Sequence, residues 1–286
     1  MRLVRTLTGI GTALTGLTLS GAVWAQAALQ GLETVGKPKP EGIYFQPAAT
    51  ELARDIHWLD DLIMWIITII TDFVALLLLW IPFRYNRRRN PVAATFTHNS
   101  ALEVAWTIVP IIILIVIGVF SLPVLFKQME IPEAELNIKI TGNQWYWSYE
   151  YTDENLSFDS FMLAREDLAK NGYAPDEYLL ATDTAVVVPI NKIVVLSITG
   201  SDVIHSWTIP AFGVKQDAVP GRLAQSWFKA EREGVYFGQC SELCGKDHTF
   251  MPIVVKVVSQ AVYDEWLKTS LAAANGTPAP VAVASN

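Results

Sequence analysis

Twelve residues near the C-terminus combine side chains that bind soft metals. The segment reads Cys-Ser-Glu-Leu-Cys-Gly-Lys-Asp-His-Thr-Phe-Met and runs from Cys240 to Met251. It contains both cysteines of the chain, together with an imidazole and a thioether. Thiolate, imidazole and thioether ligands in combination favour copper and a few other soft metals. We therefore expect a soft-metal site, with copper as the foremost candidate.

A second imidazole, His205, lies 35 residues before Cys240 on a segment that is predicted to be a separate strand. One cysteine, two histidines and a weak methionine would form a mononuclear blue-copper site. Here the second thiolate, from Cys244, changes the chemistry, because two thiolates can each bridge two coppers. Each copper would then take one imidazole, from His205 or His248. Met251 and a backbone carbonyl from the loop would complete the two sites.

The first 25 residues are typical of a secretory signal peptide, with Arg2 and Arg5 before an apolar run and cleavage expected after Ala25. An uncleaved membrane helix is the alternative, but the run is short and rich in threonine and glycine. Export to an oxidising compartment would permit a disulfide between the two cysteines. A Cys-x-x-x-Cys disulfide closes a very small loop and contributes little to stability, so a metal site remains the preferred interpretation.

Two apolar stretches, 58–84 and 104–127, are each long enough to cross a bilayer as a helix. A buried helix hairpin of a soluble protein is the alternative. The intervening segment 85–103 begins within a cluster of four arginines at 84–89, which marks the cytoplasmic side of a membrane. Segment 26–57 and everything after the second span would then lie on the exported side, in agreement with the signal peptide.

Two acidic residues of the hairpin need separate explanations. Asp72 is near the middle of the first span, where a charged carboxylate is costly. It is either a protonated or hydrogen-bonded residue that faces another protein helix, which we prefer, or a proton-handling group. Both interpretations predict that this helix packs against a partner. Ser100 and Glu103, just before the second span, have the spacing of a helix capping box.

Residues 128–270 are predicted to form an all-β sandwich of the Greek-key type, with a helical insertion at 164–172 and a final helix at 261–273. The Ala/Pro/Val-rich tail, 271–286, is predicted to be disordered. Alternating, β-branched or aromatic runs bounded by turn residues mark the strands. These runs are 136–140, 145–151, 185–188, 193–198, 235–237 and 253–258.

Aromatic and acidic residues characterise this domain further. Trp145, Trp147, Tyr149 and Tyr151 would share one face of a strand and therefore predict sheet packing. Residues 127–286 carry 20 acidic and 12 basic side chains, a net charge of −8, whereas the whole chain has −7. This acidic character argues against a nucleic acid partner.

Asp202-Val-Ile-His205-Ser-Trp, followed by Cys-Ser-Glu-Leu-Cys-Gly-x-x-His-x-x-Met behind a two-helix hairpin, resembles subunit II of bacterial aa3-type cytochrome c oxidases. The resemblance covers about 26–267. It implies a cupredoxin-like periplasmic domain that is anchored in the bacterial inner membrane. It also implies a respiratory electron-transfer subunit with a dinuclear copper centre, CuA, which accepts electrons from cytochrome c. The partners would be the lipid bilayer, other oxidase subunits and subunit I, whose haem a, haem a3 and CuB reduce oxygen while protons are pumped.

The resemblance also implies roles for single residues. The side-chain ligands of CuA would be His205, Cys240, Cys244, His248 and Met251. Glu242 would add its main-chain oxygen, and its carboxylate would reach a magnesium or manganese ion at the interface with subunit I. Electrons would arrive at Trp145 and leave through His248. Glu103 matches a position near the mouth of a proton-uptake channel in subunit I.

A docking surface for cytochrome c is implied as well. That partner is strongly basic, so the acidic domain would steer it electrostatically, with Glu150, Asp159 and Asp202 around Trp145. Segment 215–222 would form a polar loop that faces subunit I. The chain has no Cys-x-x-Cys-His motif and is therefore expected to carry no covalent haem.

Rival functions share parts of this pattern. Subunit II of quinol oxidases has the hairpin and the sandwich but lacks the copper ligands, whose side chains are all present here. Soluble domains of the nitrous-oxide-reductase type share the ligand motif, but the membrane hairpin argues against them. A membrane-tethered copper protein that carries electrons or delivers metal without an oxidase remains open from the sequence.

Overall fold

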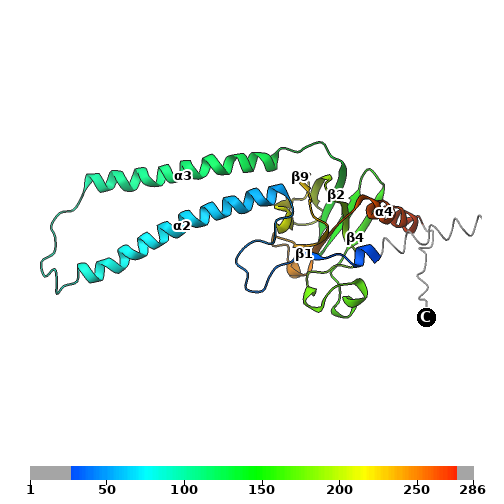
Figure 1. The fold of residues 1–286 in the computed structure, drawn as a ribbon, viewed down its shortest axis with the longest axis horizontal. Helices are drawn as coiled ribbons and strands as arrows, with labels where there is room; N and C mark the ends of the chain where they lie inside the picture. The colour runs from blue at the N-terminus through cyan, green and yellow to red at the C-terminus, as the bar shows by residue number, and fades with distance from the viewer. Residues whose placement is uncertain (1–26, 276–286) are drawn as a thin grey trace, which may run out of the picture. The chain divides into compact units, whose positions relative to one another are not determined.

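The computed structural model describes residues 27–275, which belong to two compact units (Figure 1). One unit is Arg54–Glu130, and the other contains the chain up to Ala53 and from Ile131 onward. The predicted signal peptide and residues 276–286 of the predicted tail lie outside the described residues.

Two long helices, α2 (Glu51–Arg84) and α3 (Ser100–Met129), account for most of the first unit. At about 1.5 Å per residue they are roughly 50 and 45 Å long, whereas the hydrocarbon core of a bilayer is about 30 Å thick. Both helices are long and apolar enough to cross a membrane. The most apolar segment of each helix has no residue buried by the rest of the described chain. Asp72 is exposed on α2, so its contact with a partner helix remains a prediction. The helices extend beyond the predicted spans, whose limits within the membrane also remain predictions.

The ends of the helices that lead into the other unit contact each other. Lys127 Nζ lies 2.6 Å from Asp55 Oδ2, and the rings of Trp58 and Phe120 meet edge to face with their centroids 5.5 Å apart.

The start of α3 differs from the prediction. Its N-cap is Asn99, whose side chain accepts the Leu102 N–H at 3.2 Å. The predicted capping box of Ser100 and Glu103 is therefore wrong, because asparagine is one of the strongest N-cap residues and takes that position one residue earlier. Glu103 lies in the first turn of the helix, and its side chain is exposed.

The second unit is a β-sandwich followed by the helix α4 (Gln260–Ala274). Its sheets have the orders β1-β10-β11-β5 and β4-β3-β2-β6-β9, and β7 pairs with β8 in a separate hairpin. The strands are β1 (Thr34–Gly36), β2 (Leu136–Asn143), β3 (Tyr146–Tyr151), β4 (Leu156–Ser160), β5 (Val186–Pro189), β6 (Ile193–Gly200), β7 (His205–Ile209), β8 (Val214–Ala218), β9 (Ala224–Lys229), β10 (Gly234–Gln239) and β11 (Pro252–Val258). The predicted hairpin followed by an all-β sandwich is confirmed.

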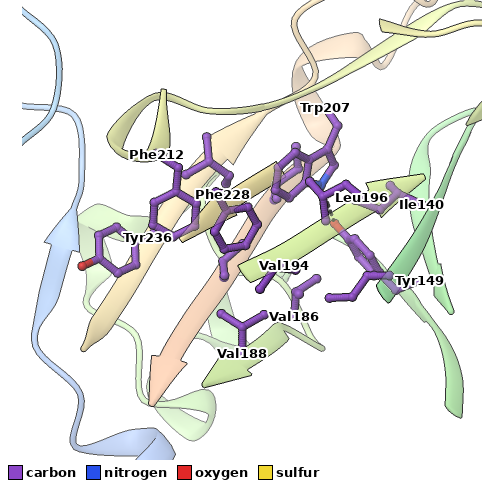
Figure 2. Close-up of a cluster of buried hydrophobic side chains, with 14 of the residues drawn as sticks. Ile140, Tyr149, Val186, Val188, Val194, Leu196, Trp207, Phe212, Phe228 and Tyr236 are labelled. Carbon is purple, nitrogen blue, oxygen red and sulfur yellow. Dashed lines mark hydrogen bonds between the residues drawn. The ribbon is translucent and has the colours of Figure 1, made fainter. Parts of the chain in front are cut away.

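The hydrophobic core contains side chains from both sheets (Figure 2). Val186 and Val188 of β5 join Val194 of β6 and Phe228 of β9 in one buried cluster. Phe228 stacks on Phe212, with ring centroids 4.6 Å apart. Burial alternates along the whole of β2, as the period of two along the strand requires.

The segment before α2 is built into the sandwich. β1 pairs in parallel with β10, which the sequence analysis did not predict. Ala49 donates its N–H to Ala211 O at 2.8 Å. The Thr50 hydroxyl donates to Phe212 O at 2.8 Å and accepts the Ala53 N–H at 3.0 Å. The first turn of α2 is therefore capped and fastened by the same residue.

Three local predictions change. Trp145 precedes β3 and does not share the buried face of Trp147, Tyr149 and Tyr151. The predicted polar loop 215–222 is wrong in its first half, because β8 pairs with β7 and extends to Ala218. The predicted helical insertion consists of three 3-10 turns, Arg165–Asp167, Ala169–Asn171 and Pro175–Glu177.

Tyr151 fastens one sheet to the other. Its hydroxyl donates to Val187 O at 2.8 Å and accepts the Val187 N–H at 2.9 Å. Val187 lies on β5, which is an edge strand, so the hydroxyl satisfies two backbone groups of that edge. A buried backbone group without a partner is costly.

Tyr151→Phe should lower the free energy of unfolding by about 1–3 kcal/mol, because it leaves the buried N–H and C=O of Val187 unsatisfied. Chemical denaturation of the full-length chain in detergent, followed by near-ultraviolet circular dichroism, measures the change. Tyr146→Phe is the matched control, because the half-buried Tyr146 ring stacks on Phe161 at 4.6 Å and the variant keeps that ring. Equal losses in the two variants would contradict the role of the hydroxyl.

Candidate metal centre

The two cysteines lie side by side beneath the surface. Cys240 Sγ and Cys244 Sγ are 3.9 Å apart, and both residues are buried. His205 completes a cluster in which the ligand atoms lie within 4.8 Å of one another. Its Nδ1 is 3.9 Å from Cys240 Sγ. Three soft or borderline donors therefore point at one small volume.

Three further groups converge on the same thiols. His248 Nδ1 and Met251 Sδ each lie 3.5 Å from Cys244 Sγ. The carbonyl oxygen of Glu242 lies 3.4 Å from Cys240 Sγ. The structure thus brings together all six residues that the sequence analysis named, and each thiol has its own imidazole neighbour. This set of soft and borderline donors is compatible with a copper site.

Strand pairing positions these residues. Cys240 directly follows β10 and Met251 directly precedes β11, and these antiparallel strands pair as far as Gln239 and Pro252. Four of the candidate donor side chains therefore lie in one loop with fixed ends. His205 is the first residue of β7, and the Ser241 N–H donates to Ser206 O at 3.0 Å, which ties the loop to that strand.

Two glycines let β7 pass close to its neighbours. A Cβ atom added at Gly142 of β2 would lie 2.9 Å from Cβ, Cγ and Cδ2 of His205. One added at Gly238 of β10 would lie 1.8 Å from Thr208 O. Neither contact can be accommodated without a shift of β7. Neither glycine was singled out from the sequence, although a glycine inside a strand is a known sign of close backbone approach.

Two side chains outside the donor set orient the ligands. Asp202 Oδ1 is 2.9 Å from His205 Nε2, while Oδ2 accepts the Gln144 N–H at 2.7 Å. Trp147, fully buried, meets the His205 ring edge to face at 5.9 Å, and its Nε1–H donates to Met251 O at 3.3 Å. Partners of this kind fix the orientation of metal-binding side chains.

The two thiols differ in acidity. Burial opposes ionisation of Cys240, but contacts with His205 and backbone groups outweigh it and lower its pKa to about 7. Burial and the neighbouring Cys240 raise the pKa of Cys244 to about 12. A second thiolate is therefore disfavoured unless a cation neutralises the pair, as a bound metal would.

Trp145 packs against the ligand loop from the surface. Its Nε1–H donates to Cys244 O at 3.3 Å, and the Gln144 side chain donates to the same carbonyl at 2.7 Å. The ring is half-buried. The contribution of Gln144 was not predicted, because it depends on contact between segments about one hundred residues apart.

The predicted docking carboxylates occupy two places. Glu150 and Asp159 line a shallow surface cavity of about 370 Å³ over β2, β3 and β4. Glu150 pairs with Lys139 at 3.0 Å, and Asp159 accepts the Ser148 hydroxyl at 2.6 Å. Asp202 instead uses both of its oxygens beside the ligands, as described above. The carboxylate of Glu242 is exposed.

Comparison with known proteins identifies the family. The models of the periplasmic and transmembrane domains of "Cytochrome C oxidase subunit II" match residues 136–258 and 38–124. Cytochrome c oxidase subunit 2 of Cereibacter sphaeroides is 58% identical over 282 residues, which cover 94% of this chain and 92% of that protein. The chain belongs to the cytochrome c oxidase subunit II family. It is thus a membrane protein and part of an oxidoreductase complex of the haem–copper type, as the resemblance implied.

Two further proteins are similar to this chain. A probable cytochrome c oxidase subunit 2 of Rickettsia bellii is 46% identical over 84% of this chain and 88% of that protein. The solved periplasmic domain of subunit II of cytochrome oxidase of Bradyrhizobium japonicum is 49% identical. It covers 50% of this chain and 97% of its own, with a TM-score of 0.45. Copper binding is a property of the subunit II family, and the cluster of His205, Cys240 and Cys244 is compatible with it.

Gly142→Ala should weaken copper binding by about tenfold or more, because the added methyl group displaces the His205 imidazole from its orientation. Competition with a copper chelator measures the affinity. Gly118→Ala is the matched control, because a Cβ at Gly118 on α3 has nothing within 4 Å. An unchanged copper affinity in Gly142→Ala would show that His205 does not bind the metal or that β7 moves freely.

Proposed function

We propose that this chain is the electron-accepting subunit of a respiratory cytochrome c oxidase. It would receive electrons from cytochrome c at a dinuclear CuA centre and pass them to haem a in subunit I, where oxygen reduction and proton pumping take place. In a member of the subunit II family, one observation carries the proposal. Two thiols, two imidazoles, a thioether and a carbonyl converge in one largely buried cluster.

The residues that would hold the two coppers are His205, Cys240, Cys244, His248 and Met251, with the main-chain oxygen of Glu242. Bound there, the copper pair would supply a one-electron couple shared over two metals. The separate contacts of Cys240 with His205 and of Cys244 with His248 support one imidazole for each metal. Asp202 and Trp147 would keep His205 and Met251 in place, which favours a site of constant geometry.

Trp145 would be the point at which electrons arrive. Its ring is partly exposed, and its indole N–H is bonded to the carbonyl of Cys244, so a donor at the surface would be one hydrogen bond away from a ligand residue. Glu150, Asp159 and Asp202 would attract the basic cytochrome c. The remaining exposure of Asp202, 34% of its side chain, permits this role beside its bond to His205.

His248 and Glu242 would face subunit I. His248 is half-buried, and it would be the residue through which electrons leave toward haem a. The carbonyl oxygen of Glu242 contacts Cys240, whereas its carboxylate is exposed to solvent. One residue could therefore bind two metal sites, with the carbonyl at CuA and the carboxylate at a magnesium or manganese ion between the subunits. Carboxylate oxygens are the ligands that such hard cations prefer.

The pairing of β1 with β10 supports the proposed topology. Chain segments on both sides of the hairpin belong to one folded unit, so both must lie on the same side of the membrane. The arginine cluster 84–89 would lie on the cytoplasmic side of the membrane. The folded unit would then lie on the opposite side, which is the periplasm. The proposed spans remain 58–84 and 104–127, and Glu103 would lie at the cytoplasmic end of the second span, near proton uptake in subunit I.

Purification of the intact complex tests the function. The chain should travel with a haem a-containing subunit, and its electron paramagnetic resonance spectrum should show the hyperfine pattern of one electron shared by two coppers. Cys244→Ser should abolish that pattern and the mixed-valence near-infrared absorption, whereas Ser241→Ala in the same loop should retain both. A chain that carries the copper signal but runs without haem a would be a copper carrier. A near-infrared band that survives in Cys244→Ser would contradict the dinuclear centre.

Trp145→Phe should slow electron arrival from cytochrome c by roughly tenfold or more, about 1.4 kcal/mol in activation free energy, because it removes the indole and its bond to Cys244. Stopped-flow kinetics measure the limiting rate, and titration at low salt measures the affinity, which should change little. Trp266→Phe is the control, because it makes the same substitution at a tryptophan of α4 outside the cluster of donor side chains. The Trp266 ring packs on Tyr151, with ring centroids 5.4 Å apart. A large loss of affinity with an unchanged limiting rate would make Trp145 a docking residue instead.

A further inference from the structure

Lys246 lies over the indole ring of Trp145. Its ammonium nitrogen is 5.4 Å from the ring centroid, which is within the range of cation–π contacts. The Lys246 side chain is 78% exposed, and its nitrogen lies 3.4 Å from Asp247 Oδ2. A positive charge therefore stands at the surface, on the face of the residue at which electrons would arrive.

The ligand loop holds Lys246 in this position. Gly245 has φ +126°, and a Cβ atom on it would lie 3.0 Å from Trp145 Cζ2. The ring thus packs on the backbone immediately before Lys246, while its Nε1–H donates to Cys244 O. The backbone of Lys246 cannot leave the ring without a change in the segment between Cys244 and His248.

This charge contrasts with the rest of the domain. Residues 127–286 carry a net charge of −8. Two acids next to Lys246 or Gln144 already have partners: Asp247 pairs with Lys246, and Asp202 contacts His205 and Gln144. The acidic surface that attracts a basic partner therefore has a cation at the proposed point of electron arrival.

We propose that Lys246 is a specificity-determining residue for the electron donor. This inference rests on the proposed role of Trp145. A donor whose redox cofactor approaches Trp145 must bring its contact surface next to the Lys246 ammonium. A basic side chain at the centre of that surface is repelled, whereas an apolar cofactor edge or an acidic side chain is accepted. The partner that fits is a redox protein with an apolar or acidic contact centre and basic residues only at its periphery, where they meet Glu150 and Asp159.

Charge reversal at two matched lysines tests the inference in the intact oxidase. Lys246→Glu changes the charge beside Trp145. Lys268→Glu on α4 makes the same change in net charge at a lysine that is 60% exposed and lies 3.5 Å from Glu265. Stopped-flow rate constants for copper reduction are measured with a lysine-rich mitochondrial cytochrome c in its reduced form, and with two small reductants of opposite charge, hexaammineruthenium(II) and the anionic iron(II)–EDTA complex.

At low ionic strength Lys246→Glu should raise the rate constants with lysine-rich cytochrome c and hexaammineruthenium(II) by about tenfold or more over Lys268→Glu, the factor expected in water when one of two unit charges about 6 Å apart is reversed. The rate constant with the anionic iron(II)–EDTA complex should fall by a similar factor, and high salt should remove all three differences. Lys246→Arg should behave as the wild type.

Equal effects of the two charge reversals would overturn the inference, because only net charge would then matter. A wild-type complex without the CuA resonance signal, or one whose copper none of the three reagents reduces, would instead contradict the proposed function. The two failures are therefore distinguishable.

Discussion

The two adjacent thiols of Cys240 and Cys244 impose the constraint on which the site depends. Their sulfur atoms are 3.9 Å apart in a buried position, where like charges repel and water cannot stabilise them. Two thiolates can persist at this distance only with a cation between them. The fold must therefore hold a pair of groups that would otherwise separate, and it does so with backbone hydrogen bonds. β10 and β11 remain paired up to the residues that flank the loop.

The rest of the site is assembled on that loop from distant parts of the chain. His205 comes from the β7–β8 hairpin, and Gly142 of β2 leaves the space that its ring occupies. Asp202 links the imidazole to the turn that carries Trp145, and Trp147 binds the backbone of Met251. Side chains outside the loop therefore contact His205, Cys244 and Met251. The same contacts connect the cluster of donor side chains to the surface at Trp145.

The sequence was most informative where function depends on local spacing. The four soft donor side chains of 240–251 could be grouped from the sequence because they are close along the chain, and the strands could be predicted from their period of two. Trp145 was misplaced because the alternating pattern in the sequence starts one residue before the strand begins. β1 and the bonds of Gln144 and Asp202 were missed, because they join segments whose proximity is set only by the packed sandwich. The pairing of Lys246 with Trp145 belongs to the same class of contacts.

The parallel pairing of β1 with β10 has a consequence for biogenesis. β10 leads directly into Cys240, yet its neighbour in the sheet precedes both long helices in the chain. The edge of the sheet at β10 cannot be completed until the N-terminal segment and the C-terminal domain lie on the same side of the membrane. Membrane insertion of the helices would thus come before maturation of the metal centre. A fragment that begins at Ile131 would lack this strand, and metal loading would have to proceed on an unfinished sheet.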